Sequence, residues 1–158
     1  MRNTEQVTIE VIESAQFHLF VVSYVFYKAS SIVRALNEAL DRGVQLKVLL
    51  ESSVEEGGSV KLDGLKSLHQ AVPGGQFYIW DSSVKNPRND NLSYSVHAKC
   101  VVADSRLAFI TSANLTSAAL ERNMELGLLI RGGNVPERLH AHLEALATLE
   151  VIKKWEPS

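Results

Sequence analysis

The sequence predicts an α/β fold in which a mixed β-sheet lies between helices. Residues 17–51 have the pattern strand, helix and strand, a unit that joins two parallel strands by a right-handed crossover. Residues 96–114 have the pattern of two strands joined by a tight turn, which makes them antiparallel. At 158 residues, 46% hydrophobic and 22% charged, the chain is expected to form a single domain over residues 1–158.

The individual elements follow from apolar spacing and turn residues. Helices show apolar side chains at helical spacing, and strands are short runs rich in β-branched and aromatic residues. We expect Thr4 to cap the first helix, Ser30 or Ser31 to cap the second, and Gly43 to end it. In the first half of the chain we expect a helix over 3–15, a strand over 17–25, a helix from the serine cap to Gly43, a strand over 44–51, a helix over 63–72 and a strand over 76–80. In the second half we expect strands over 96–104 and 106–114, a helix over 115–122, a strand over 123–130 and a helix over 136–149.

Two polar segments interrupt this pattern. Residues 52–60 follow the carboxyl end of a predicted parallel strand, where loop chemistry is a reasonable expectation. Residues 81–95 are long for an ordered connection, so they are either a solvated surface loop or functional. Lys85 and Arg88 in that loop either contact a phosphate backbone or are scattered surface charges.

The bulk chemistry narrows the setting. A net charge of −2 gives no strong field for polyanions, so any phosphate binding must be local. Cys100 is the single cysteine and the N-terminus lacks the pattern of a secretory signal, which together predict a cytoplasmic protein. No apolar run approaches the roughly 20 residues that span a bilayer, so we expect no membrane residence.

The stretch HAKCVVADSRLAFITSAN, residues 97–114, carries polar residues where buried strands are usually apolar. Each of them therefore needs a partner or a function. Strand alternation puts His97 and Lys99 on one side and Cys100 on the other, where we expect a core thiol rather than a nucleophile.

The turn between the two strands decides which side chains meet. If residues 105–106 form a two-residue loop, four polar side chains converge on a patch suited to one phosphate group. A three-residue loop would shift the register by one and scatter them. The two-residue loop pairs Asp104 with Leu107, Lys99 with Ser112, and His97 with Asn114.

This stretch resembles the signature of the phospholipase D superfamily, H-x-K-x4-D followed by S-x-N. Residues 17–51 are similar to that superfamily's opening strand-helix-strand, and NMELG supplies a matching glutamate. Thr111 departs from the pattern, since many members have glycine there. The segments LLESSVEEGG, SVHAKC, TSANLTSAALERNMELG and IRGG most resemble the phospholipase D-like component of bacterial DISARM anti-phage systems. The matched positions are His97, Lys99, Asp104, Ser112, Asn114 and Glu125.

The resemblance implies a phospholipase D-like half-unit and a role for each matched residue. His97 is the nucleophile that forms a covalent phosphohistidine, and Glu125 orients its ring. Lys99, Ser112 and Asn114 hold the non-bridging phosphate oxygens. This scheme requires no metal and no cofactor. Asp104, at the far end of its strand, is expected to give structural or electrostatic support.

The leaving oxygen needs a proton from a second acid near neutral pKa. The chain carries one motif, and single-motif members of the superfamily pair two chains, so we expect a homodimer with two His97 residues at its two-fold axis.

The leading function that the resemblance implies is a metal-independent phosphodiesterase acting on nucleic acid, most simply DNA, in anti-phage defence with other proteins of the system. RNA stays open as a substrate. The alternatives are a phospholipid or lipid-phosphate hydrolase and a catalytically weak interaction subunit.

The remaining aromatic and histidine residues have simpler expectations. Tyr24 and Phe26, at the end of the first strand, are expected in the core, although an aromatic there could line the substrate cleft. The other four histidines are expected at the surface or at edges, and they are His18, His69, His140 and His142.

Overall fold

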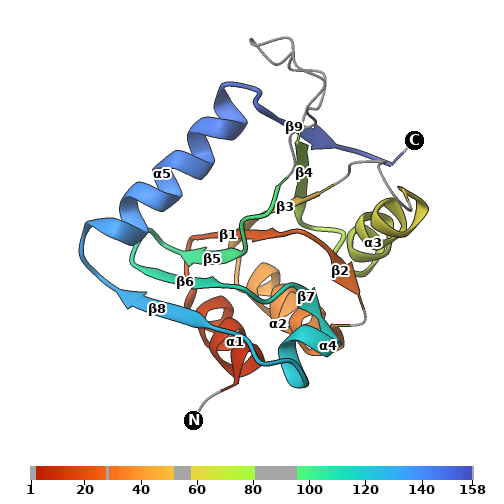
Figure 1. Ribbon diagram of the computed structural model, residues 1–158. Coiled ribbons are helices and arrows are strands. Elements are labelled where there is room, and N and C mark those ends of the chain that lie inside the picture. Colours follow the sequence, from red (N-terminus) through yellow and green to blue (C-terminus); the bar gives the residue numbers. More distant parts are fainter. Residues whose placement is uncertain (1–2, 28, 52–57, 81–95, 158) are drawn as a thin grey trace, which may run out of the picture.

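The computed structural model describes residues 3–27, 29–51, 58–80 and 96–157 (Figure 1). Its helices are α1 (Thr4–Ser14), α2 (Ser30–Asp41), α3 (Gly58–Ala71), α4 (Ser117–Glu121) and α5 (Asn134–Thr148). Its strands are β1 (His18–Ser23), β2 (Phe26–Tyr27), β3 (Gln45–Leu50), β4 (Gln76–Trp80), β5 (Cys100–Ala103), β6 (Leu107–Thr111), β7 (Leu115–Thr116), β8 (Gly127–Arg131) and β9 (Ile152–Trp155).

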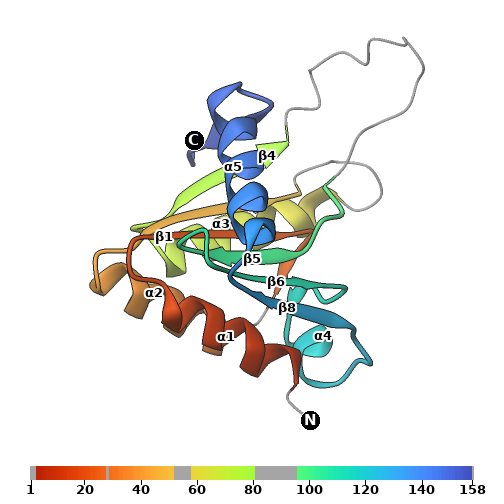
Figure 2. The same cartoon turned by 90° about the vertical axis from the view of Figure 1, so that its left-hand side faces the viewer.

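The main sheet has seven strands in the order β8-β6-β5-β1-β3-β4-β9, and β2 pairs with β7 apart from it. Strands β1, β3 and β4 are parallel to one another, whereas β5, β6, β8 and β9 join in antiparallel fashion. Helix α5 covers one face of the sheet, and α1, α2 and α4 lie on the other (Figures 1 and 2). This arrangement confirms the predicted mixed sheet between helices.

Strand β1 lies at the centre of the core. Five of its six residues are buried, as expected for a strand covered on both faces. Leu19 and Val21 belong to the core shared with α1, α2 and α3, while Phe20 and Val22 belong to the core shared with Leu143 of α5. The alternation of side chains along one strand therefore holds the two layers together.

The helix ends differ in part from prediction. Asn3, not Thr4, caps α1, because its side chain accepts the backbone N–H of Gln6 while the Gln6 side chain accepts that of Asn3. The serine cap predicted for α2 is absent, since Ala29 precedes the helix and no side chain caps it. Gly43 ends α2 as predicted, with a φ of 86° that favours glycine.

Several element boundaries and two strand pairings, β4 with β9 and β2 with β7, were not predicted from the sequence. Helix α3 begins at Gly58, five residues before the predicted start at 63. Strand β9, which pairs antiparallel with β4, was not predicted, and β7 occupies residues assigned to a helix. The greater part of the predicted loop over 52–60, and all of 81–95 with Lys85 and Arg88, lie outside the described residues. In the ranges that the structure describes, no helix is long and apolar enough to cross a membrane.

The turn between β5 and β6 corrects the predicted register. Ala103 pairs with Leu107, so three residues, 104–106, connect the strands instead of two. The backbone N–H of Arg106 donates to the carbonyl of Ala103 over 3.0 Å. Asp104 and Ser105 have φ values of 51° and 57°, a left-handed conformation that Asp tolerates better than most residues. The prediction that Asp104 pairs with Leu107 is therefore wrong.

The carboxylate of Asp104 ties this turn to the start of β1. It accepts the backbone N–H groups of Gln16, Phe17 and His18 over 2.8, 2.9 and 2.8 Å, and the Asp104 N–H donates to the carbonyl of His18 over 2.9 Å. Partial burial alone raises the pKa of this carboxyl, but the three N–H donors and the nearby His18 outweigh it, so the net pKa lies below its usual value. Asp104 thus belongs to the turn because the backbone of residues 16–18 binds its side chain.

Replacing Asp104 with Asn should destabilise the fold. The change removes a charge and turns one acceptor oxygen into a donor, so we expect the free energy of unfolding to fall by about 1–2 kcal/mol, a range that allows for solvent screening of a partly exposed group. Urea unfolding monitored by circular dichroism measures this loss. Asp41→Asn, at an exposed aspartate that ends α2, is the matched control and should change stability by less than about 0.5 kcal/mol.

The pH dependence has a defined sign. Because the folded pKa of Asp104 is lowered, its contribution is fully present above the unfolded pKa of about 3.9 and is lost as pH falls through the folded pKa. The stability difference between wild type and Asp104→Asn should therefore be constant from about pH 5 to pH 8 and shrink below about pH 4. A difference that stays constant at acid pH would contradict the role of the charge.

Candidate active site

His97 lies at the edge of the sheet where β1 and β3 end and β5 begins, which we call the His97 edge. The residue precedes β5, and its side chain is exposed. The backbone ladder continues beyond β5, since the N–H of Thr111 donates to the carbonyl of Lys99 over 3.1 Å. Lys99 is half-buried in this extended segment. The two strands therefore bring the first part of the motif to solvent at the carboxyl ends of the parallel strands.

The shifted register changes which residues face each other here. Lys99 lies opposite Thr111 and not opposite Ser112, because the β5–β6 turn holds three residues. The predicted pairs of Lys99 with Ser112 and of His97 with Asn114 are wrong for the same reason. Direct strand pairing therefore does not bring the four polar side chains to one patch.

Three side chains do meet at the His97 edge, and we call Tyr24, His97 and Lys99 the His97 cluster. The rings of Tyr24 and His97 stack with centroids 4.6 Å apart and an interplanar angle of 27°. The Lys99 Nζ donates to the backbone carbonyl of His97 over 2.7 Å and lies 5.8 Å from the centre of the Tyr24 ring. Phe26 packs in the core as predicted, whereas half-buried Tyr24 is the aromatic that reaches the candidate site.

Glu51 supports the segment that carries His97. It follows the last residue of β3, is 2% exposed, and its carboxylate accepts the backbone N–H of Val96. This bond anchors the chain one residue before His97. Glu51 was not predicted as a site residue, although an acidic residue at the carboxyl end of a buried parallel strand is a signal that could have identified it.

Ser112 and Glu125 form a separate pair beside the His97 cluster. The Ser112 hydroxyl donates to the Glu125 carboxylate and accepts the N–H of Leu126 over 3.0 Å. The Ser112 N–H donates to the carbonyl of Leu126 over 2.9 Å. Over the described part of the chain no hydrogen bond joins Glu125 to His97, so the orientation of His97 by Glu125 stays a prediction.

The hydrogen bonds of the Thr111 side chain give a physical reason for a threonine where many superfamily members have glycine. Its hydroxyl donates to the carbonyl of Leu126 over 3.0 Å and accepts the N–H of Ala113 over 3.1 Å. A glycine could make neither bond. The threonine therefore fixes both the bend after β6 and the loop that carries Glu125.

Asn114 is half-buried, and its buried Oδ1 atom finds no hydrogen-bond partner among the described residues. Ser23 connects this region to the end of β1. Its hydroxyl, fully buried, donates to the carbonyl of Val25 over 2.9 Å and accepts the N–H of Leu115 over 3.1 Å. The buried side chain of Ser23, the residue before Tyr24, thus binds the backbone of Leu115, the residue after Asn114.

Cys100 and His140 do not belong to this edge. Cys100 belongs to the core under α5, and burial raises the pKa of its thiol to about 12, which rules it out as a thiolate nucleophile. The expectation that His140 lies at the surface is wrong. It is 7% exposed, and its two ring nitrogens have polar partners, with Nδ1 2.7 Å from the Ser105 hydroxyl and Nε2 3.4 Å from the Glu144 carboxylate.

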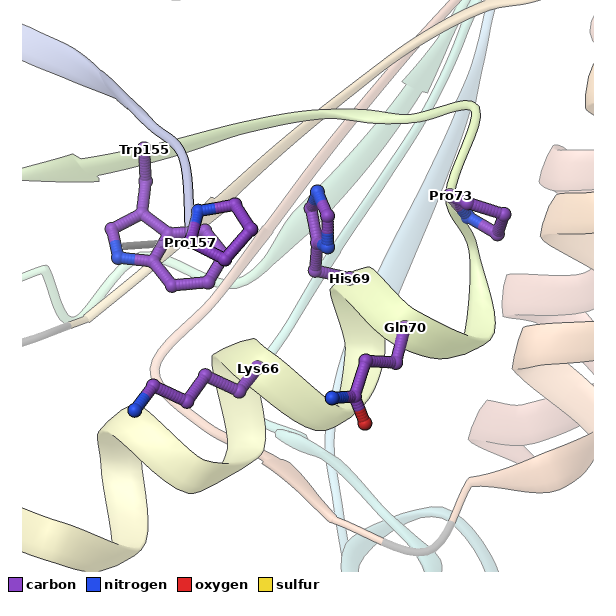
Figure 3. A pocket seen from close by; sticks show the side chains of 6 residues that line it. All are labelled: Lys66, His69, Gln70, Pro73, Trp155 and Pro157. Atoms are coloured by element: carbon purple, nitrogen blue, oxygen red, sulfur yellow. The ribbon is translucent and has the colours of Figure 1, made fainter.

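A pocket of about 430 Å³ lies between α3 and β9 (Figure 3). His69 contacts the rings of Trp155 and Phe77 edge-on, at centroid distances of 5.5 and 5.3 Å. Trp155 pairs with Phe77 near the start of β4, so the pocket lies at the sheet edge opposite the His97 edge. The pocket is therefore separate from the candidate site.

Within residues 3–157, apart from the gaps given above, no three His, Cys, Asp or Glu side chains gather as a metal site would require.

Comparison with known sequences gives three matches of note. Residues 8–147 match the family described as "Cardiolipin synthase, PLD-like domain". A cardiolipin synthase from Clostridium perfringens is 26% identical over 122 residues, which cover 75% of this chain and 25% of that protein. The DISARM protein DrmC from Bacillus paralicheniformis is 26% identical over 137 residues, which cover 85% of this chain and 52% of that protein. The chain thus spans between a quarter and about half of the length of the curated relatives it matches.

A solved structure agrees with the sequence matches. Nuc from Salmonella typhimurium, a phospholipase D family member, is 21% identical with a TM-score of 0.70, over 96% of this chain and 90% of that one. At this identity the similarity shows the fold. The family match, which spans the segment from His97 to Glu125, confirms the resemblance drawn from the sequence, and the chain belongs to the phospholipase D-like family.

Proposed function

We propose that this protein is a metal-independent phosphodiesterase in which His97 is the nucleophile. Members of its superfamily act on phosphodiester bonds. The observation that carries the proposal is an exposed imidazole at the His97 edge, with the Lys99 ammonium bound to the backbone carbonyl of the same residue. A neutral imidazole attacks phosphorus well, and a nearby cation stabilises the charge on the phosphoryl oxygens.

The proposed reaction has two displacements. A ring nitrogen of His97 attacks phosphorus, the bond to the leaving oxygen breaks, and that oxygen takes a proton from a general acid. Water then attacks the phosphohistidine and gives a proton back to the general acid, the P–N bond breaks, and a phosphomonoester leaves with His97 and the acid restored. The Lys99 ammonium, with Ser112 and Asn114 as further donors, holds the non-bridging oxygens in both steps. Asp104 takes no part, since its carboxylate binds backbone N–H groups at the opposite edge.

We propose that the general acid is His97 of a second copy, in a homodimer with the site at its two-fold axis. The surface around the Ser112–Glu125 pair supports a partner there, because large apolar side chains are exposed on it and such patches favour association. Three of them, Ile110, Leu126 and Leu128, also line a cavity of about 530 Å³ together with Ser112. The exposed side chains are Ile110, Met124, Leu126 and Leu128.

The substrate that we propose is nucleic acid, most simply DNA, in cytoplasmic anti-phage defence with further proteins of the system. The similarity to DrmC over 85% of this chain supports the defence role. A net charge of −2 is compatible with local phosphate binding and with delivery of DNA by partners.

A second candidate is a phospholipid or lipid-phosphate hydrolase. The specific observation in its favour is the match to a cardiolipin synthase over 75% of this chain. The same nucleophile would serve both reactions, so the two candidates differ in substrate binding and not in chemistry.

His97→Ala should reduce phosphodiester hydrolysis at least about 1000-fold, because no other described residue supplies the nucleophile. The assay uses bis-p-nitrophenyl phosphate, single-stranded DNA, duplex DNA, RNA and phospholipid vesicles, each with EDTA present. We expect DNA cleavage that survives EDTA. His142→Ala, at an exposed histidine of α5, is the matched control and should keep activity within about twofold.

The outcomes of this assay separate the candidates. Activity on vesicles without activity on DNA or RNA selects the lipid candidate. Loss of activity in EDTA contradicts the metal-independent mechanism, and full activity in His97→Ala contradicts the nucleophile.

Mixing subunits tests the dimer. With about nine parts of His97→Ala to one part of wild type, random exchange leaves about one tenth of the wild-type chains in wild-type pairs. Activity per wild-type chain should then fall about tenfold relative to the unmixed enzyme. Unchanged activity per wild-type chain, together with a 17.4 kDa monomer in sedimentation, would show that one chain suffices.

A further inference from the structure

Tyr24 is the first residue after β1, and the structure fixes its backbone on both sides. Ser23 before it is 0% exposed and is hydrogen-bonded to Val25 and Leu115. Phe26 after it is buried and pairs with Leu115 in the β2–β7 ladder. The tyrosine therefore extends from a short bend whose neighbours on both sides are buried and held by hydrogen bonds or strand pairing.

The side chain of Tyr24 lies against the imidazole of His97 in an offset stack, at 4.6 Å and 27°. Among the residues that the structure describes, no hydrogen bond holds either ring nitrogen of His97. The Lys99 ammonium donates to the backbone carbonyl of His97 and lies 5.8 Å from the centre of the Tyr24 ring, so it binds no ring nitrogen of His97 within the described residues. In the part of the chain that the structure describes, the stack with Tyr24 is thus the side-chain contact that bears on the plane of the imidazole.

The plane matters for the proposed reaction. In-line attack needs the ring nitrogen aimed at phosphorus opposite the leaving oxygen, and a small misplacement of a reacting group costs much of the rate. The ring also becomes positively charged when it is phosphorylated or protonated, and the electron-rich face of tyrosine attracts such a charge. The stack with Tyr24 therefore favours both the direction of the attacking ring nitrogen and the positive charge of the phosphorylated ring.

We propose that Tyr24 is a positioning residue that holds the His97 imidazole for attack through its ring face. This inference rests on the proposed function of His97. It assigns the role to the aromatic ring and not to the phenol hydroxyl. A phenylalanine at position 24 should therefore serve, whereas an aliphatic side chain of similar bulk should not.

The experiment compares Tyr24→Leu with Tyr24→Phe on bis-p-nitrophenyl phosphate. We expect kcat to fall about 10- to 100-fold in Tyr24→Leu, with KM changed less than about threefold, because the contact aims the nucleophile and does not bind substrate. Tyr24→Phe should keep at least about one third of kcat. Tyr27→Leu, at an exposed tyrosine three residues away, is the matched control and should stay within about twofold of wild type.

A second measurement does not depend on activity. Proton NMR of the imidazole, assigned with His97→Ala, should show a ring-current shift of His97 in wild type and Tyr24→Phe that is absent in Tyr24→Leu. Thermal unfolding of the variants checks that the fold is kept. If Tyr24→Leu does not fold, Tyr24→Met carries the same test.

Three outcomes would overturn the inference. Equal losses in Tyr24→Phe and Tyr24→Leu would assign the role to the hydroxyl. A rise in KM for DNA with unchanged kcat on the small diester would make Tyr24 a base-stacking residue. Unchanged kcat in Tyr24→Leu, with His97→Ala inactive, would remove the positioning role of Tyr24 and leave the proposed function intact. If His97→Ala were itself active, the proposed function of His97 would be wrong, and the role of Tyr24 would fall with it.

Discussion

The position of His97 depends on the carboxylate of Asp104, which lies at the opposite edge of the sheet. By binding the N–H groups of residues 16–18, this carboxylate makes Asp104 part of the β5–β6 turn and sets that turn against the start of β1. Because strand pairing is periodic, a register set at one end of a hairpin is inherited at the other. The bonds that hold Asp104 in the three-residue turn therefore favour the register in which Lys99 faces Thr111 at the His97 edge.

The candidate site is assembled from the ends of strands, each held by a polar side chain of its own. Glu51 holds the segment before His97, Ser23 joins the end of β1 to the residue after Asn114, and Thr111 holds the loop that carries Glu125. Glu51 and Ser23 accept the backbone N–H groups of Val96 and Leu115, and Thr111 adds a second donor to the Leu126 carbonyl that already accepts the Ser112 N–H. The site is therefore shaped by buried or half-buried polar residues, while the exposed imidazole of His97 is left for chemistry.

The sequence predicted the architecture well because hydrophobic periodicity reports burial directly. The strand over 17–25 and the helix ending at Gly43 both came from local patterns, and both are present. The motif residues could be identified by spacing alone. Their mutual geometry could not, because the register depends on a tertiary bond between Asp104 and residues 16–18 that no local pattern encodes. Tyr24 was expected in the core for the same reason, since its stacking partner is 73 positions further along the chain.

The buried Oδ1 atom of Asn114, which finds no donor in the described part of the chain, has a consequence for the evolution of this fold. An amide oxygen that is desolvated without a donor lowers the stability of the resting chain. An apolar side chain of similar size would relieve this cost and would also remove the polar group from the neighbourhood of the His97 edge. Selection for thermal robustness and selection for a competent site therefore act in opposite directions at this one position.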